Sequence, residues 1–396
     1  MKLLCLSNGH GEDVVAVQIL QQLQRHPNPP EIAALPLVGQ GSAYAQLDIP
    51  IIGPVQRMPS GGFIYMDGRQ LWRDLRGGLV GLTLAQYRAI RQWVSSQDSG
   101  NGAIAILAVG DIVPLLFAWL SGADYAFIGT AKSEYYLRDD RGWLPQTSRI
   151  ERALGSVYLP WERWLMSRPR CQAVFPRDSL TANVLQQWQI PAFDLGNPMV
   201  EGISLENLRV ATDAQNPEKQ DSLIVLLLPG SRSPEAERNW EQMIRAVTGM
   251  MVTCNDIPLV FLGAIAPSVS LEALEKHLLF QGWKAQPPGS TVAPIPNLKA
   301  LAFTQKNATL FLTQEAYAAC LQAADLAIAM AGTATEQFVG LGKPAIAIPG
   351  RGPQFTYAFA EAQSRLLGLS LILVERPEQV AETIRSLLHH PERLQL

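Results

Sequence analysis

The sequence contains few cysteines and few histidines. Its four cysteines, in a chain of 396 residues, stand far apart without a C-x-x-C pair, and there are five histidines in all. This distribution excludes a disulfide framework and suggests no zinc site. We therefore expect buried thiols in a reducing compartment.

Long hydrophobic runs and a net positive charge are also absent. The first seven residues are too short an apolar run for a signal peptide, and the longest later run, 112–120, is about half the length that spans a bilayer. Lys plus Arg is 32 against 35 Asp plus Glu, so no basic field indicates nucleic acid. We expect a cytoplasmic protein with no integral anchor and no nucleic-acid partner.

Three phosphate-binding motifs are missing. There is no G-x-x-x-x-G-K-[ST] loop, no early G-x-G-x-x-G, and no D-x-D pair of the kind that holds a metal against a nucleotide diphosphate. The sequence therefore argues against a P-loop NTPase. The phosphate groups of a ligand would have to be bound by arginine side chains and helix N-termini. We expect no cofactor and no required metal.

Short apolar runs, each followed by a Gly- or Pro-containing turn and a helical pattern, recur along the whole chain, which is typical of parallel α/β units. The predicted strands are 2–7, 104–109, 173–176, 193–195, 223–228, 259–262, 308–312, 326–330 and 345–348. The predicted helices are 13–25, 112–120, 234–251, 314–324 and 333–341. The fold class is α/β, with two facing Rossmann-like domains.

A polar stretch over 201–220 breaks the pattern and marks a domain boundary. We predict an N-terminal domain over 1–200, a linker over 201–222, a C-terminal domain over 223–375, and a final helix within 376–396 that is free to pack back on the first domain. Ligands of such sheets bind at the carboxyl ends of the strands, so the strand-to-helix loops are the candidate sites.

The loop 229–234 follows the most apolar strand and opens a helix. Its Gly230 and Ser231 leave backbone N–H groups accessible, and Arg232 adds a guanidinium suited to a phosphate. The alternative is that Ser233 caps the helix, Pro234 starts it, and Arg232 is merely solvated.

A second loop, 330–336, has the same position after another strand. Its small residues allow a ligand to approach closely; the candidates are Gly332, Thr333, Ala334, Thr335 and Glu336. Thr333 and Glu336 also fit a capping box, which would explain both by helix initiation alone. In the next loop, 349–354, a rigid Gly/Pro backbone would hold Gln354 beside Glu336, unless this loop is an ordinary surface turn.

Three residues of the first domain are candidates for acid–base chemistry. His10 lies between two glycines in a strand-to-helix loop, where it could act as a general base near neutral pH. Asp13 follows in the first helical turn, and Asp111 ends the strand 104–109. The alternatives are a solvated His10, an Asp13 that only favours the helix dipole, and an Asp111 that only caps its helix.

Basic and aromatic residues alternate in two stretches of the first half. Six arginines and two aspartates lie within 57–91, and the residues expected to meet a membrane or acceptor are Arg69, Trp72, Arg73 and Arg76. Within 138–177 eight arginines and four acids accompany Trp143, Trp161 and Trp164. This mixture suits an anionic membrane surface. The alternative is two solvated helical faces with buried aromatic residues.

Two motifs carry a resemblance that covers nearly the whole chain. Residues 227–232 read L-L-P-G-S-R and 331–336 read A-G-T-A-T-E. Together they resemble the lipid-A-disaccharide synthase family and, more broadly, nucleotide-sugar glycosyltransferases of the GT-B type. The first loop, 9–13, is instead closer to the Gly-His loop of galactolipid-type and cell-wall transferases.

The resemblance implies an inverting transfer of an N-acetylglucosamine-type or hexose unit from a UDP-sugar to a lipid acceptor, by an enzyme peripherally associated with the membrane. It implies that Asp111 or His10 is the base, that Asp13 belongs to the same site, and that Glu336 binds the ribose and Gln354 the sugar. Arg232 and the helix at Thr333 would stabilise the diphosphate that leaves. Two alternatives remain: a UDP-sugar 2-epimerase, and a non-catalytic nucleotide-sugar-binding membrane adaptor.

Overall fold

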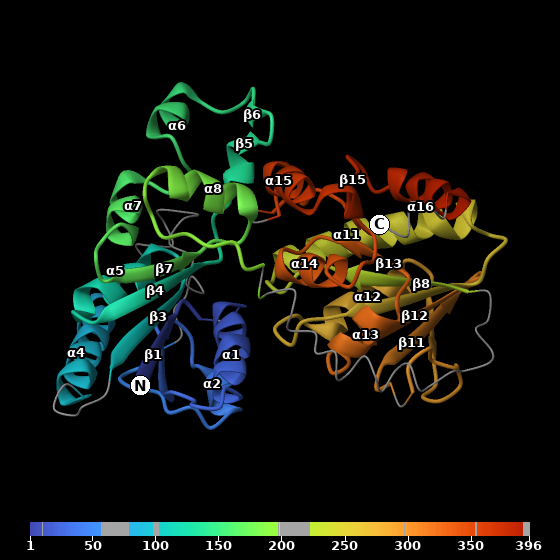
Figure 1. The fold of residues 1–396 in the computed structure, drawn as a ribbon. Helices are drawn as coiled ribbons and strands as arrows, with labels where there is room; N and C mark the ends of the chain where they lie inside the picture. Colours follow the sequence, from blue (N-terminus) through green and yellow to red (C-terminus); the bar gives the residue numbers. More distant parts are fainter. Residues whose placement is uncertain are drawn as a thin grey trace. The chain divides into compact units, whose positions relative to one another are not determined.

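The computed structural model describes residues 1–9, 11–56, 79–97, 103–196, 198, 222–296, 298–352 and 355–390. The chain divides into two compact units, Met1–Pro198 and Met199–Leu396 (Figure 1). Of the predicted linker 201–222, only Ser222 falls among the described residues.

The first unit is built on a five-stranded parallel sheet in the order β2-β1-β3-β4-β7. Its strands are β1 (Lys2–Ser7), β2 (Glu31–Pro36), β3 (Ile104–Gly110), β4 (Asp124–Gly129) and β7 (Cys171–Phe175). In this register Ser7, the last residue of β1, pairs with Pro36 of β2 and Val109 of β3. The carboxyl ends of β1, β2 and β3 therefore share one edge of the sheet.

In the described part of the first unit, helices and one small hairpin accompany this sheet. They are α1 (Gly11–Gln24), α2 (Ser42–Ala45), α4 (Leu79–Gln97), α5 (Ile112–Ser121), η1 (Glu134–Tyr136), β5 (Arg138–Asp139), β6 (Gly142–Trp143), α6 (Arg149–Leu154), α7 (Pro160–Met166) and α8 (Ser179–Gln187). Local capping explains several of their starts. Ser148 and Glu151 form a capping box at α6, and Asp178 accepts from the backbone N–H of Thr181 at α8.

The second unit has an eight-stranded sheet in the order β10-β11-β12-β9-β8-β13-β14-β15. Its strands are β8 (Leu223–Leu228), β9 (Leu259–Ala264), β10 (Lys284–Gln286), β11 (Leu301–Gln305), β12 (Ala308–Thr313), β13 (Leu326–Ala329), β14 (Ala345–Ala347) and β15 (Leu371–Leu373). Pairing is parallel from β12 to β15, whereas β10 and β11 are antiparallel additions at one edge.

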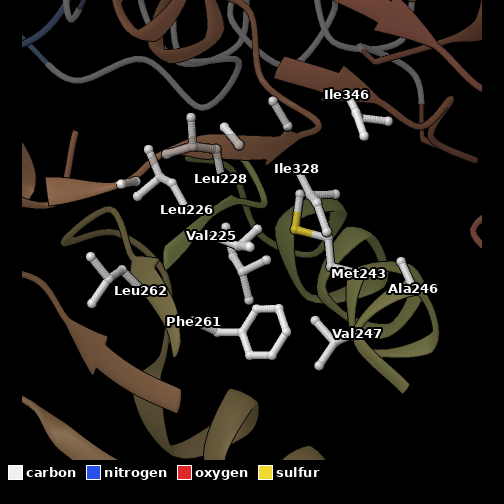
Figure 2. Close-up of a cluster of buried hydrophobic side chains, with 14 of the residues drawn as sticks. Val225, Leu226, Leu228, Met243, Ala246, Val247, Phe261, Leu262, Ile328 and Ile346 are labelled. Atoms are coloured by element: carbon white, nitrogen blue, oxygen red, sulfur yellow. The ribbon is translucent and has the colours of Figure 1, made fainter. Parts of the chain in front are cut away.

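The helices of the second unit are α11 (Glu235–Thr253), α12 (Leu271–Phe280), α13 (Tyr317–Ala323), α14 (Thr333–Val339), α15 (Tyr357–Leu367), η2 (Gly368–Ser370) and α16 (Gln379–His389). Because β8 lies in the middle of the sheet, its side chains are covered on both faces. Figure 2 shows part of this core, where Met243 and Val247 of α11 gather with Phe261 and Ile328.

Most of the predicted elements are present, and β1 and β8 have the predicted bounds. The predicted strand 193–195 is wrong: only Ala192 forms an isolated bridge, to Val174, while Phe193 and Leu195 are exposed. The final helix, α16, buries Val380, Ile384 and other residues in the core of the second unit. It is therefore part of that unit, and residues 391–396 lie outside the described part of the chain.

No helix among the described residues has the length and hydropathy needed to cross a bilayer. Arg69, Trp72, Arg73 and Arg76, the residues expected at a membrane or acceptor, all fall within 57–78, outside the described residues.

Candidate functional site

In the second unit, three loops leave the carboxyl ends of the neighbouring strands β8, β13 and β14. The first two loops touch. Gly230 has a φ of +99°, and a Cβ at this position would lie 3.3 Å from the carbonyl oxygen of Met330. A glycine is therefore required where the loop after β8 passes the loop after β13.

The loop after β8 ends at the first turn of α11. Arg232 is half-buried and Ser231 is exposed, while the N-cap position is Pro234 and has no side-chain cap. The hydroxyl of Ser233 donates to Glu237 at 2.5 Å instead of capping the helix. The buried Asn239 of α11 holds the loop in place, since its Nδ2 donates to the carbonyl oxygen of Pro229 at 3.0 Å.

The loop after β13 does not form the capping box that the sequence allows. The N-cap of α14 is Gly332, without a side-chain hydrogen bond, so Thr333 is not the cap. Glu336 is 1% exposed and accepts from Gln363 Nε2 at 3.5 Å; the same amide donates to the carbonyl oxygen of Gly332 at 3.0 Å. Burial of this carboxyl group is not explained by helix initiation.

Two other predicted residues of this loop have internal roles. Thr335 is fully buried and donates its hydroxyl to the carbonyl oxygen of Ala331 at 2.5 Å, so its side chain is engaged within the loop. Ala334 is half-buried and packs against the core of the unit. Neither side chain offers a polar atom to a ligand, whereas those of Thr333 and Arg232 are half-buried polar groups.

The loop after β14 is attached to the start of α11. Glu235 is buried and its Oε1 accepts the backbone N–H of Phe355 at 2.9 Å. A Cβ on Gly352 would overlap the carboxyl group of Glu235, so the loop and the helix are in close contact. Gln354, which the sequence places beside Glu336, lies outside the described residues. Sequence reasoning missed Glu235, although it is the first residue of a helix that follows the Arg232 loop.

These contacts join the loop after β13 to the loop after β8, and the loop after β14 to the start of α11, at one edge of the sheet. The side chains there include the guanidinium of Arg232 and the buried carboxyl of Glu336. Arginine binds phosphate oxygens, and a carboxylate accepts hydrogen bonds from sugar hydroxyls. Within the described residues no group of three or more His, Cys, Asp and Glu side chains is placed to hold a metal ion.

The first unit has a second group of polar residues, at the carboxyl edge of β1 and β3. Asp13 is 4% exposed, and burial raises its pKa to about 6 against the opposing effect of hydrogen bonds from Ser7 and Gly9. Ser7 Oγ donates to Asp13 Oδ1 at 2.6 Å. His10 is the one residue of this loop outside the described residues, so its predicted role as base stays a prediction.

Asp111 both caps a helix and is buried. Its Oδ1 accepts the backbone N–H of Val113 at 2.8 Å, which confirms the capping alternative. Burial raises the pKa of this carboxyl group, while the bonds from Val113 and Asn8 and the charge of Lys132 oppose the shift. A cap with a raised pKa can still exchange a proton, so the two roles are compatible.

Sequence reasoning missed Lys132 as well as the strand β4 that places it. The ammonium group of Lys132 lies 2.5 Å from Glu162 Oε2, and Glu162 is 1% exposed. The apolar run from Tyr125 to Ile128 was the available signal for β4. Since β4 pairs with β3, Lys132 follows the strand next to the one that precedes Asp111.

The basic and aromatic stretch 138–177 is partly exposed and partly buried. Trp161 and Trp164 are exposed, and the guanidinium of Arg168 lies 4.4 Å from the centroid of Trp164. In contrast, Tyr158 and Leu165 are core residues. The stretch therefore combines buried aromatic residues with exposed ones, and its contact with a membrane stays a prediction.

No protein-family model matches the chain, and no curated protein matches it. Solved structures do. A putative UDP-N-acetylglucosamine 2-epimerase from Listeria monocytogenes superposes with a TM-score of 0.58 at 15% identity, over 99% of this chain and 89% of that one. A UDP-GlcNAc 2-epimerase from Neisseria meningitidis bound to UDP-GlcNAc gives 0.55 at 15% identity, over 99% and 93%.

The calicheamicin glycosyltransferase CalG4 is also similar, with a TM-score of 0.55 at 12% identity, over 99% of this chain and 92% of that one. None of these three neighbours is a lipid-A-disaccharide synthase. At such low identities the likeness concerns the fold. The chain has the GT-B fold of two Rossmann-like domains, which confirms the fold class predicted from the sequence.

Proposed function

We propose that this protein is an enzyme that acts on a UDP-sugar, held by the loops after β8, β13 and β14 of the second unit. The observation that carries the proposal is that the loop after β8, with the start of α11 that follows it, contacts both of the other loops. Gly230 lies beside Met330, and Glu235 of α11 is bonded to Phe355. The site also has one half-buried guanidinium, at Arg232. The similar Neisseria protein was solved with UDP-GlcNAc bound, which makes this nucleotide sugar the first ligand to test.

Each loop has a distinct proposed role. Backbone N–H groups at Gly230 and Ser231, together with Arg232, meet the diphosphate, because a guanidinium and free N–H groups bind phosphate oxygens. The loop from Gly332 to Thr333 lets the nucleotide approach closely. Glu336 accepts the ribose hydroxyls, and Gln354 binds the sugar. The proposal requires no metal ion.

The first candidate reaction is 2-epimerisation of the UDP-sugar. Two of the similar structures carry that activity in their names, one of them as a putative assignment. This reaction inverts one carbon of the sugar and needs a group that removes a proton and a group that returns one. Asp13 and Asp111 are buried carboxyl groups whose pKa values are raised, and that of Asp13, about 6, suits proton exchange near neutral pH.

The second candidate is transfer of the sugar to the hydroxyl of a lipid acceptor at a membrane surface. It is favoured by the two motifs that resemble lipid-A-disaccharide synthases, by the similar glycosyltransferase structure, and by the exposed Trp161 and Trp164. In this reaction Asp111 or His10 takes the acceptor proton as the acceptor oxygen attacks the anomeric carbon. The bond to the diphosphate breaks, and UDP leaves with its electron pair.

The donor site is tested by unfolding the protein with UDP, ADP or GDP in the presence of EDTA. A ligand that binds only the native state raises the midpoint of unfolding. We expect a rise with UDP that is lost in Arg232→Ala and kept in Arg238→Ala, an exposed arginine on α11. No rise at millimolar UDP would overturn the proposed site.

Products separate the two reactions. With UDP-GlcNAc alone, an epimerase forms the C2 epimer, which proton NMR detects directly. With a membrane lipid extract, a transferase releases UDP only when the lipid is present. Binding of UDP without either product would leave a non-catalytic nucleotide-sugar-binding adaptor.

A further inference from the structure

A row of buried polar side chains leads to Asp13 from the interior of the first unit. Tyr44 Oη donates to Ser7 Oγ at 2.6 Å, and Ser7 Oγ donates to Asp13 Oδ1 at 2.6 Å. Tyr44 and Ser7 are fully buried, and Asp13 is 4% exposed. A fourth group, the thiol of Cys5, lies 3.8 Å from Tyr44 Oη.

Three elements of the unit bring these residues together. Ser7 is the last residue of β1, Asp13 stands in the first turn of α1, and Tyr44 belongs to α2, which packs against α1. An acid in the first turn of a helix usually lies in solvent, where it favours the dipole. Asp13 is instead turned inward, where an unpaired carboxylate would be costly.

The direction of the hydrogen bonds follows from counting protons. Each hydroxyl has one proton to donate, so a tyrosine that donates to Ser7 must itself accept from Cys5. Burial raises the pKa of Cys5 to about 12 and holds the pKa of Tyr44 well above its usual value, so both keep their protons at neutral pH. The row therefore runs in one direction, from thiol to phenol to hydroxyl to carboxylate, and Asp13 Oδ1 can only accept.

We propose that Ser7 and Tyr44 are positioning residues for Asp13, which fix the orientation of its carboxyl group and stabilise the ionised form that accepts a proton from substrate. This inference rests on the proposed function, in which Asp13 takes part in acid–base chemistry on the sugar. It adds two residues that neither the motifs nor the resemblance indicated. Polar groups in such a row also reinforce one another, so loss of Tyr44 should weaken the bond that Ser7 makes.

Other titratable groups near α1 are few among the described residues. Cys5 and Lys2 lie on β1, Tyr44 on α2, Asp111 after β3, and Glu12 on α1 itself. Of these, Cys5 and Tyr44 belong to the row, and the charge of Asp13 raises the pKa of both. A change at Ser7 should therefore act on Asp13 directly, and a change at Tyr44 should act on it through Ser7.

The test measures the pH profile of kcat/KM for UDP-GlcNAc in the full chain. Ser7→Ala removes a bond that favours the carboxylate, so the acid limb should move about one pH unit upward, with about tenfold lower activity on the acid side. Tyr44→Phe should move it less, in the same direction. Ser7→Thr keeps the hydroxyl and should restore the original limb.

Two matched variants control for the loss of a buried hydroxyl. Ser121 Oγ donates to the carbonyl oxygen of Ala118 at 2.6 Å, and Tyr125 Oη donates to that of Leu165 at 2.6 Å; both residues are buried in the same unit. Ser121→Ala and Tyr125→Phe should leave the acid limb in place. Equal shifts in these variants and in those of the row would overturn the proposal.

A second measurement does not depend on turnover. Infrared difference titration of the carboxyl band, assigned with Asp13→Asn, reports the protonation of Asp13 in each variant. A higher midpoint in Ser7→Ala supports the positioning role even if UDP-GlcNAc is not a substrate, in which case it is the proposed function that fails. An unchanged midpoint in both Ser7→Ala and Tyr44→Phe would overturn the positioning role while leaving the function open to its own test.

Discussion

Glu235 Oε1 accepts the backbone N–H of Phe355 at 2.9 Å, across 120 positions of the chain. This bond attaches the loop after β14 to the helix that follows the Arg232 loop. It joins the segment expected to hold the sugar to the segment expected to hold the diphosphate.

We expect Gly352→Ala to displace the loop after β14, because the added Cβ would overlap the carboxyl group of Glu235. Affinity for UDP-GlcNAc should fall about tenfold, which corresponds to about 1.4 kcal/mol. Calorimetric titration of each protein with UDP-GlcNAc measures this change in affinity. Gly81→Ala is the matched control, since a Cβ there meets nothing within 4 Å. Unchanged affinity in Gly352→Ala would show that this loop does not contact the ligand.

Asp13→Asn should stabilise the protein at neutral pH. The folded-state pKa of Asp13, about 6, lies above the value of about 3.9 for an unfolded chain, so folding binds a proton more tightly. The ionised form therefore costs stability above pH 6, by about 2–3 kcal/mol, and this cost disappears below about pH 4. An asparagine at this position removes the cost of the buried charge, and its Oδ1 can still accept the hydrogen bond from Ser7.

The measurement is chemical unfolding of both proteins at pH 7.5 and pH 4. The gain should be present at pH 7.5 and absent at pH 4. A gain of the same size at both pH values would mean that the charge of Asp13 is not its source.

Glu134 should contribute strongly to the stability of the first unit. It is fully buried, accepts from Ser156 Oγ and the backbone N–H of Val157, and lies 2.7 Å from Arg138 Nε. Glu134→Ala leaves the arginine without its buried partner, which typically costs about 3–5 kcal/mol. Urea unfolding measures this change.

The pair formed by Glu272 and Lys276 provides the comparison. Both side chains are more than two-thirds exposed, although their atoms are 2.6 Å apart. Exposed pairs contribute little, so Glu272→Ala should leave the unfolding midpoint unchanged. If the two variants unfold alike, the buried network around Glu134 does not stabilise the unit.

Binding to an anionic membrane should depend on Trp161 and Trp164. Both are exposed, and Arg168 stacks on Trp164, which combines apolar surface with positive charge. In the double variant Trp161→Ala/Trp164→Ala, cosedimentation with vesicles containing phosphatidylglycerol should fall at least severalfold, and in the unmodified protein it should weaken with salt. Phe280→Ala, an exposed aromatic of the second unit, is the control. Equal binding by all three proteins would exclude this surface as the contact.

The sequence predicted the parts of the fold that depend on local pattern. The strands β1 and β8 are uninterrupted apolar runs that end in turns, so their bounds could be placed to the residue. β4 was missed although its run is apolar, because only four consecutive apolar residues, Tyr125–Ile128, mark it. The polar residues of the loop after β8 were likewise visible, since Arg232 stands among small residues.

The contacts that complete each site depend on tertiary register and could not be predicted locally. Tyr44 stands in a helix of four residues with no periodic pattern, and it meets Ser7 because β2 pairs beside β1. Glu235 carries no signal in the sequence beyond being an acid at the start of a helix, and its bond to Phe355 depends on how β8, β13 and β14 are ordered in the sheet. Such pairs are fixed by the whole fold.

The place of α16 has a consequence for synthesis of the chain. This helix buries Val380, Ala381, Ile384 and Leu387 in the core of the second unit, against α11, which follows the central strand β8. The apolar face of α11 leaves the ribosome long before the residues that cover it. During translation, part of the core of the second unit therefore stays exposed until α16 has been synthesised. In this interval a chaperone that binds exposed apolar surface protects the chain best from aggregation.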